Sequence, residues 1–323
     1  MRRLGCLFVL LIAAAAVFAV FQFDRNWSGD GPLAAPATIT VPEGATLRSM
    51  ARRLEEAGAV RSGDGFFVFA RLLGGAGVIK TGDYKLPAHA SGAQILEILQ
   101  GGKTVALLIT IPEGMPSVLV AERLKANADL SGPSAIPREG SILPDSYGYE
   151  RGESRANVMA RMQAAMDKFL AAEWPKRAPG LLVKTPAEAI ALASIVEKET
   201  GIAKERATVA AVYYNRLRTG MRLQADPTII YPITKGKPLG RRILQSEVRA
   251  VNGYNTYAMA GLPEGPIANP GRAAILAVLH PAQSEALYFV ADGKGGHIFA
   301  NTYAEHQANV AKWYAIRRQR GEM

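Results

Sequence analysis

Residues 185–201 read TPAEAIALASIVEKETG and predict the helix from which the rest of the fold can be worked out. Thr185 is a typical helix-capping residue, Pro186 suits the first turn, and Glu188 stands where it would complete a capping box. Because these signals fix where the helix begins, each later side chain can be placed around it at about 100° per residue.

One acidic residue of this helix falls among its apolar side chains. Glu199 lies beside Ile195 and Leu192, whereas Lys198 points almost the opposite way and Glu197 lies toward the edge. A carboxylate in such a place is either paired with a cation or has its pKa raised by desolvation. A raised pKa suits a general acid, because a carboxyl that stays protonated near neutral pH can donate to a leaving oxygen.

The pairing alternative would make Glu199 a structural residue. Three arginines nearby in the sequence are candidate partners: Arg206, Arg216 and Arg222. Helix geometry alone leaves both alternatives open.

The N-terminal segment predicts a membrane anchor. Arg2 and Arg3 precede an uncharged apolar stretch from Leu4 to Phe23, which is long enough to cross a bilayer as a helix. The residues that follow lack a small-x-small cleavage site, which favours a retained anchor over a cleaved signal peptide. The arginines place the first residues in the cytoplasm and predict export of everything after Asp24. We therefore expect a single-pass protein of the cytoplasmic (inner) membrane.

Composition narrows the function further. The chain has 323 residues, a formal net charge of +10 and a single cysteine, Cys6. An intramolecular disulfide and a cysteine-based metal cluster are therefore excluded. In a cytoplasmic protein the positive charge would make nucleic-acid binding a candidate function. An exported protein meets lipid head groups and cell wall instead. Simple solubility is the alternative explanation of the charge.

Four ranges divide the chain. We expect a cytoplasmic stub and transmembrane helix (1–23), a Gly-, Pro- and Ala-rich tether (24–37), a LysM-like region (38–130) and a catalytic domain (140–323). The LysM-like region contains an internal repeat, because ITVPEG at 39–44 returns as ITIPEG at 109–114, each followed by a helical pattern. Its first half predicts strand, helix, helix and strand up to Leu86. A packing domain without a ligand is the alternative.

The region after Gly140 predicts long helices and one β-hairpin, so the exported part is of the α+β class, mixed but mainly helical. The expected helices are 157–173, 185–200, 203–218, 271–279 and 303–318, and the hairpin is 286–300.

Five blocks of sequence in the second half carry a family resemblance. They are LASIVEKET (192–200), LQADPT (223–228), YNTY (254–257), GLPEGPIANPG (261–271) and YFVADGKGGH (288–297). In this order they closely resemble the endolytic murein transglycosylases of the MltG (YceG-like) family, and with the anchor and LysM-like region the resemblance covers almost the whole chain. One local departure is Ser146, where the family usually has threonine.

The resemblance implies a lytic transglycosylase. Such an enzyme cleaves the bond between N-acetylmuramic acid (MurNAc) and N-acetylglucosamine (GlcNAc) without water and leaves a 1,6-anhydroMurNAc end. The catalytic glutamate of the family corresponds to the second Glu of Glu-Lys-Glu, here Glu199, which the helix register also selects. No metal or cofactor is implied. The resemblance implies action on peptidoglycan glycan strands, in particular nascent ones. The membrane is a second implied partner, and peptidoglycan synthases are a further candidate.

The remaining candidate site residues are polar or aromatic and occur in these blocks. Gln224, Asn255, Thr256 and Tyr257 offer amide, hydroxyl and aromatic surfaces suited to sugars. Asn255 and Thr256 have a structural alternative, the closing of a turn. Asp226 either stabilises positive charge on the sugar or caps the turn before Pro227.

Two other classes of function are alternatives to the lytic transglycosylase. A non-catalytic, membrane-anchored wall-binding scaffold would keep the anchor and repeat but would not need Glu199 among apolar residues. A zinc hydrolase is disfavoured because the four histidines are scattered and a His-Glu-x-x-His motif is absent from the sequence.

Overall fold

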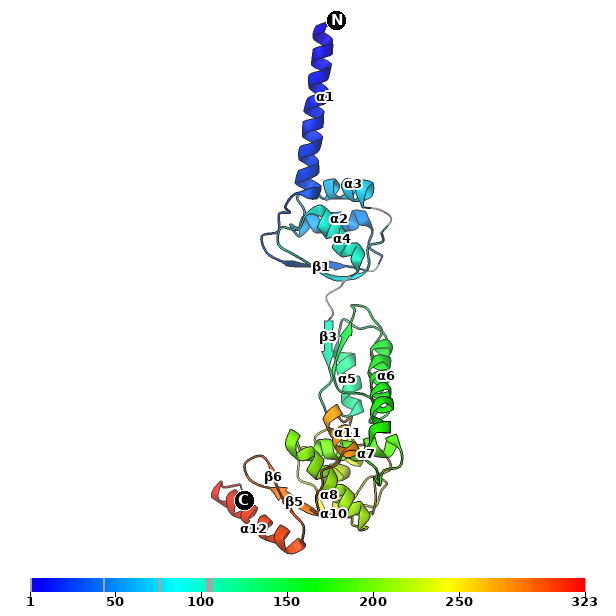
Figure 1. Cartoon of the computed structure of the whole chain (residues 1–323), viewed down its shortest axis with the longest axis vertical. Coiled ribbons are helices and arrows are strands. Elements are labelled where there is room, and N and C mark those ends of the chain that lie inside the picture. Colours follow the sequence, from blue (N-terminus) through cyan, green and yellow to red (C-terminus); the bar gives the residue numbers. More distant parts are fainter. Residues whose placement is uncertain (1, 43, 75–76, 103–106, 323) are drawn as a thin grey trace. The chain divides into compact units, whose positions relative to one another are not determined.

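A computed structural model describes residues 2–42, 44–74, 77–102 and 107–322 of the chain. It divides into two compact units, Met1–Leu107 and Leu108–Met323 (Figure 1). Helices are combined with short two-stranded sheets, so the chain has the mixed α+β class that the sequence predicts.

The first helix, α1 (Arg2–Phe23), is an uninterrupted helix of 22 residues. At 1.5 Å per residue it is about 33 Å long, close to the ~30 Å hydrocarbon thickness of a bilayer. Its large apolar side chains from Leu10 onward are exposed, and Leu10–Ser28 has the length and composition of a membrane span. The helix is therefore compatible with a single-pass membrane anchor.

The segment 24–37, expected to be a tether, packs against the first unit instead. η1 (Asp24–Ser28) is a turn of π-helix that continues α1 without a break. Trp27 is 7% exposed, and its ring centroid lies 6.2 Å from those of both Phe66 and Phe69. A Gly- and Pro-rich composition disfavours long regular elements, but it does not keep a large indole in water.

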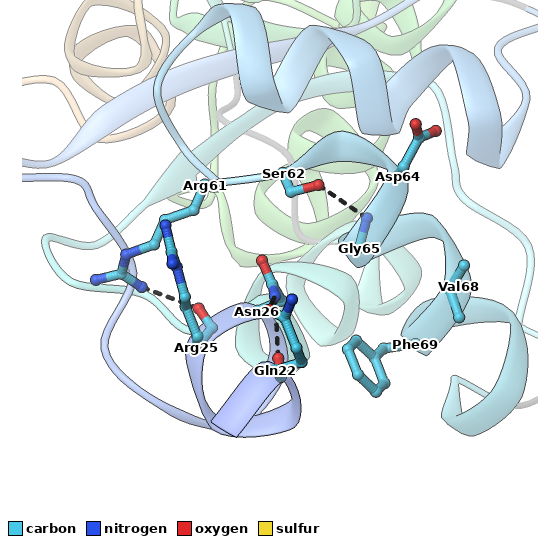
Figure 2. Close-up of a pocket in the computed structure, with 9 residues that line it drawn as sticks. All are labelled: Gln22, Arg25, Asn26, Arg61, Ser62, Asp64, Gly65, Val68 and Phe69. Atoms are coloured by element: carbon cyan, nitrogen blue, oxygen red, sulfur yellow. Dashed lines mark hydrogen bonds between the residues drawn. The ribbon is translucent and has the colours of Figure 1, made fainter. Parts of the chain in front are cut away.

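Polar contacts fix this connection (Figure 2). The Asn26 side-chain amide donates to the Gln22 carbonyl oxygen at 3.0 Å. The Arg61 guanidinium donates to the carbonyl oxygens of Arg25 at 3.0 Å and Asp30 at 2.7 Å. These bonds join the end of α1 to the residue just before the third helix.

The rest of the first unit follows the predicted order of strand, helix, helix and strand. The elements are β1 (Ala37–Val41), α2 (Leu47–Glu56), α3 (Gly63–Leu73), β2 (Gly82–Leu86) and a further helix, α4 (Gly92–Gly101). β1 pairs antiparallel with β2, with Ile39 opposite Tyr84. Side chains of Thr46, Ser62 and Ser91 cap the three helices after α1, which explains where each begins.

The two Pro-Glu-Gly copies share a local structure but belong to different units. The second copy comprises β3 (Leu107–Thr110), a turn and α5 (Ser117–Ala126), a helix of the same length as α2. Gly44 and Gly114 have φ of 73° and 69°, a conformation that favours glycine. Glu43 of the first copy lies outside the described residues. β3 pairs with β4 (Ser146–Tyr149), and residues 127–145 form turns and loops where the first unit has α3.

The boundary between the units therefore differs from the predicted one. The sequence predicts a single LysM-like region from 38 to 130, but the second copy packs with the later helices. The Gly114 N–H donates to the Asn269 carbonyl oxygen at 2.9 Å, and the Ile111 N–H donates to that of Asp145 at 2.9 Å. Repeated local patterns specify a strand and helix but not the distant partners against which they pack.

After α5, the second unit contains the five expected helices together with shorter ones that the sequence did not predict. They are α6 (Arg155–Glu173), η2 (Trp174–Lys176), α7 (Pro186–Glu199), η3 (Ala203–Glu205), α8 (Arg206–Arg218), α9 (Pro227–Thr234), α10 (Gln245–Arg249), α11 (Arg272–Leu279) and α12 (Tyr303–Gln319). The predicted hairpin is β5 (Tyr288–Ala291) with β6 (His297–Ala300). α7 packs against α8 and α11, and every residue from Ala189 to Val196 is buried. The helix therefore lacks the single apolar face assumed from its sequence, since it is covered on all sides.

Candidate active site

Glu199 is the last residue of α7, whose start is where the sequence predicts it. Thr185 Oγ1 accepts a hydrogen bond from the Glu188 N–H at 3.1 Å. The Glu188 carboxylate accepts from the Lys184 N–H at 2.5 Å and not from that of Thr185, so the capping box is only half formed. After Glu199 the backbone of Thr200 is extended, which ends the helix.

Glu199 is partly exposed as a residue, and its carboxyl group is incompletely hydrogen-bonded. Its Oε1 is buried and has no hydrogen-bond partner among the described residues. Burial, followed by the negative charge of Asp226, raises the pKa of Glu199 to about 7. The Tyr213 hydroxyl and the charge of Arg216 act in the opposite direction. Near neutral pH, both the proton donor and its conjugate base are therefore populated.

None of the three arginines considered as partners forms an ion pair with Glu199 within the described residues. Nη2 of Arg206 lies 3.9 Å from Oε1 of Glu197. The Arg222 guanidinium donates to the Tyr257 carbonyl oxygen at 2.9 Å. Arg216, which is 8% exposed, donates to the carbonyl oxygens of Leu287 at 2.7 Å and Leu223 at 2.6 Å. The geometry favours the raised-pKa alternative over the pairing alternative.

Glu197 also has a raised pKa, but its carboxylate is engaged in the structure. Burial raises the pKa of Glu197, while a hydrogen bond from Gly271 lowers it. The Gly271 N–H donates to Oε2 at 2.9 Å, and the Glu197 side chain is 6% exposed. The sequence places Glu197 toward an edge of the helix, and in the structure the start of α11 covers that edge. Glu197 ties α7 to the loop that precedes α11.

Glu139, which is partly buried, is a third glutamate of the second unit with a raised pKa. Burial is the largest cause, and hydrogen bonds from Ser117 oppose it. Both the Ser117 N–H and hydroxyl donate to Oε1 at 2.9 Å. Among these three glutamates, Glu199 alone has a buried carboxyl oxygen left unpaired by the described residues. An unpaired oxygen is what a group needs if it is to exchange a proton with a ligand.

Two of the predicted sugar-binding residues, Asp226 and Tyr257, lie close enough to this carboxyl to interact with it electrostatically. The Tyr257 hydroxyl donates to Asp226 Oδ1 at 2.6 Å. Burial, this hydrogen bond and the charges of Asp226 and Glu199 raise the pKa of Tyr257. Gln224 is exposed with φ of +53°, a strained conformation for a residue with a side chain and one that concentrates at functional sites. Asp226 stands at the start of α9 but makes no side-chain capping bond, which disfavours the capping alternative.

Asn255 and Thr256 are placed differently, with fully buried side chains. The Asn255 amide donates to the carbonyl oxygens of Val248 at 3.0 Å and Ala250 at 2.7 Å. The Thr256 hydroxyl lies 2.8 Å from that of Thr228 and accepts from the Ala225 N–H at 3.0 Å. The geometry favours their structural alternative, because these groups hold the loops that carry Tyr257 and Asp226.

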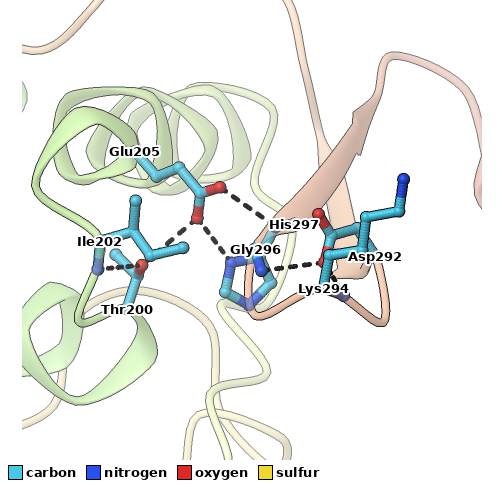
Figure 3. Close-up of polar contacts among 7 residues, drawn as sticks. All are labelled: Thr200, Ile202, Glu205, Asp292, Lys294, Gly296 and His297. Carbon is cyan, nitrogen blue, oxygen red and sulfur yellow. Dashed lines mark hydrogen bonds and ion pairs between the residues drawn. The ribbon is translucent and has the colours of Figure 1, made fainter.

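A polar cluster joins the end of α7 to the hairpin (Figure 3). His297 Nδ1 lies 2.8 Å from Glu205 Oε2, and the His297 N–H donates to Glu205 Oε1 at 3.1 Å. The Thr200 hydroxyl donates to Glu205 Oε2 at 3.3 Å. In the hairpin, Asp292 accepts from the Gly296 N–H at 2.9 Å. Burial would raise the pKa of Glu205, but the hydrogen bonds from His297 outweigh it and hold that pKa below its ordinary value.

Sequence reasoning did not assign a role to Glu205 or His297, nor to Tyr213 and Arg216 around Glu199. His297 belongs to the last of the five blocks that carry the family resemblance, and this is the one feature of the sequence that points to it. The sequence suggests Arg216 only as a candidate ion-pair partner of Glu199. No sequence motif indicates a role for Glu205 or Tyr213, because their contacts depend on how α8 packs against α7.

A glutamic acid whose pKa is raised to about 7, close to the carboxylate of Asp226 and the phenol of Tyr257, is chemically able to act as a general acid and base, and glycan-cleaving enzymes use groups of this kind. A sequence model of the YceG-like family matches residues 39–312. The chain belongs to this family.

Similar proteins are found among characterised sequences and solved structures. A protein of Streptococcus pneumoniae serotype 2 named endolytic murein transglycosylase is 29% identical over 94% of this chain, and this chain spans 63% of its length. One of Bacillus subtilis with the same name is 25% identical, over 87% of this chain and 86% of the relative. A crystal structure of a YceG-like protein from Listeria monocytogenes superposes with a TM-score of 0.54 at 26% identity, covering 84% of this chain and 98% of that one.

Proposed function

We propose that this protein is an endolytic lytic transglycosylase of peptidoglycan, with Glu199 as its acid and base. The observation that carries the proposal is the buried Glu199 carboxyl, unpaired at Oε1 and with a pKa near 7. Membership of the YceG-like family and relatives named endolytic murein transglycosylase support it.

The reaction needs one carboxyl that acts twice. Glu199 first donates its proton to the oxygen between MurNAc C1 and GlcNAc, so that the C1–O bond breaks and GlcNAc leaves as an alcohol. The MurNAc C6 hydroxyl then attacks C1 and gives its proton to Glu199. This forms the 1,6-anhydro ring, restores the acid and consumes no water. A hydrolytic glycosidase would instead need a second carboxyl as nucleophile or base.

Asp226 and Tyr257 are assigned to the developing positive charge. The exposed carboxylate of Asp226 is held by the Tyr257 hydroxyl and lies close enough to Glu199 to raise its pKa. A fixed negative charge there would stabilise an oxocarbenium-like sugar. We assign Gln224 and the Tyr257 ring to sugar contacts, and Asn255 and Thr256 to the support of that surface.

The remaining assignments concern location and range of action. We propose that α1 anchors the protein in the cytoplasmic membrane with its N-terminus inside, and that both units lie on the exported side. The β1-α2-α3-β2 part would act as a LysM-like module that holds glycan strands. Nascent strands and the synthases that make them are then the natural neighbours, and the reaction would end strand growth.

The scaffold alternative is not favoured, because a binding module has no use for an unpaired buried carboxyl that costs stability. Digestion of purified glycan strands distinguishes the two. We expect new ends of anhydroMurNAc, lighter by one water than hydrolytic ends, from the wild type and none from Glu199→Gln. Reducing ends would mean that water attacks, with Asp226 as the second carboxyl. Unchanged strands would support the scaffold.

A further inference from the structure

α3 carries a second apolar face besides the one in the core. Phe66 and Ala70 are buried in the first unit. Val68, Phe69 and Leu72 lie along another side of the helix, since residues three and four apart share a face. We call these three residues the outer stripe. Val68 is 48% exposed and Leu72 is 73% exposed, whereas Phe69 is partly buried against Trp27, so the described residues of the first unit leave most of the stripe uncovered.

The outer stripe begins beside the end of α1. The ring of Phe69 meets that of Phe23, the last residue of α1, edge to face with 5.5 Å between centroids. η1 follows α1 without a break and places Trp27 in the core only about 6 Å further along the chain. Because a flexible tether does not separate α1 from the first unit, α3 must lie at the level where α1 ends.

Polar groups lie beside the outer stripe, as expected for a helix at a membrane surface. A hollow of about 500 Å³ between the end of α1 and α3 is lined by two arginines, Arg25 and Arg61, by one acidic residue, Asp64, and by Val68 and Phe69 (Figure 2). Arg25 has no ion-pair partner among the described residues. Cations beside apolar side chains fit the boundary where lipid phosphates meet acyl chains.

We propose that α3 is an interfacial helix, which lies on the exported face of the membrane that α1 crosses with its outer stripe among the lipid chains. The inference rests on the proposed anchor. It gives the first unit a fixed orientation on the bilayer, with α3 against the lipid. β1, which lies at the end of the unit away from α1, then points away from the membrane (Figure 1).

Depth-dependent fluorescence of the full chain in vesicles tests this. The one native cysteine is replaced (Cys6→Ser), and an environment-sensitive fluorophore is attached to Leu72→Cys, to Thr38→Cys on the exposed side of β1, or to Ala14→Cys in α1. The vesicles contain phosphatidylcholine and phosphatidylglycerol, with or without bromine on the acyl chains. Leu72 and Thr38 are both exposed, so neither change disturbs the core.

We expect brominated chains to quench the labels at positions 14 and 72 and to leave the label at position 38 unquenched. Val68→Asp should reverse the quenching at position 72, because a charge is expelled from the acyl region. A label at position 72 that behaves like the one at position 38, while position 14 is quenched, would overturn the interfacial helix alone. An unquenched label at position 14 would overturn the anchor and this inference with it.

Discussion

Glu197 and Glu199 stand two residues apart on α7, yet they lie in different surroundings. The Glu197 carboxylate accepts a hydrogen bond from Gly271 and lies 3.9 Å from Arg206. The Glu199 carboxyl has an unpaired oxygen and faces the loop of Asp226 and Tyr257. Burial raises the pKa of both. For Glu197 the next largest cause is the hydrogen bond from Gly271, which lowers the pKa, followed by the charge of Glu113, which raises it. For Glu199 the next largest cause is the charge of Asp226, which raises the pKa, followed by the hydrogen bond from Tyr213, which lowers it.

The difference shows how one helix can supply structure and chemistry at once. Two residues correspond to about 200° around a helix, so the two carboxyl groups face different neighbours. The paired group stabilises the loop that precedes α11. The unpaired group costs stability and remains free to exchange a proton. A sequence motif of the form Glu-Lys-Glu therefore contains two functions that residue type alone does not separate.

The largest expected effect is on cleavage by Glu199→Gln. Glutamine keeps the size of the side chain but cannot donate and recover a proton, so the rate should fall by about 100-fold to 10,000-fold. Release of anhydroMurNAc-ended fragments from glycan strands measures this. Glu197→Gln is the matched control, since its amide oxygen can still accept from Gly271, and it should retain most activity. Equal losses in both variants would contradict the division of roles.

A second prediction concerns stability against pH. The folded-state pKa of Glu199, about 7, is above its ordinary value of 4.5, so burial favours the protonated form. The wild type should lose stability relative to Glu199→Gln as pH rises from about 4.5 to 7, by on the order of 2–3 kcal/mol, and the gap should stay constant above that range. Thermal unfolding of both proteins at pH 5 and pH 8 measures it. A gap that does not widen would argue that Glu199 is paired.

A third prediction concerns Glu197→Ala, which removes the acceptor for the buried Gly271 N–H. We expect a loss of about 1–3 kcal/mol in the free energy of unfolding, since a buried donor is left without a partner. Glu197→Gln should lose much less. Denaturant unfolding of the two variants tests this, and equal stability of Glu197→Ala and wild type would show that the hydrogen bond to Gly271 contributes nothing.

The smallest expected effect is a shift in the pH profile of cleavage. Asp226→Asn removes a negative charge that raises the pKa of Glu199, so that pKa should fall by up to about one unit. Cleavage needs protonated Glu199, and the alkaline limb of kcat/KM should therefore move to lower pH. Tyr257→Phe keeps the charge of Asp226 and should leave the limb nearly in place. A move to higher pH in Asp226→Asn would contradict the assigned electrostatics.

Local signals explain what the sequence predicts well. Thr185 and Pro186 define the start of α7, and from that register Glu199 follows. The structure also contains the predicted hairpin and the helices and strands from Ala37 to Leu86 in the predicted order, because turn residues and periodicity are local properties. The predictions that differ from the structure depend on distant contacts. Trp27 packs on α3, Gly114 bonds to Asn269, and Glu197 bonds to Gly271, and none of these partners is marked in the sequence.

The most direct test of the central claim is the titration of the Glu199 carboxyl itself. Carboxyl carbons of glutamate labelled with ¹³C can be followed by NMR across pH in the full chain, and Glu199→Gln identifies the signal of Glu199 by its disappearance. The structure predicts a midpoint near 7 for that signal. A midpoint near the ordinary value of 4.5 would mean that Glu199 is ionised at neutral pH, and would contradict its assignment as the acid that starts cleavage.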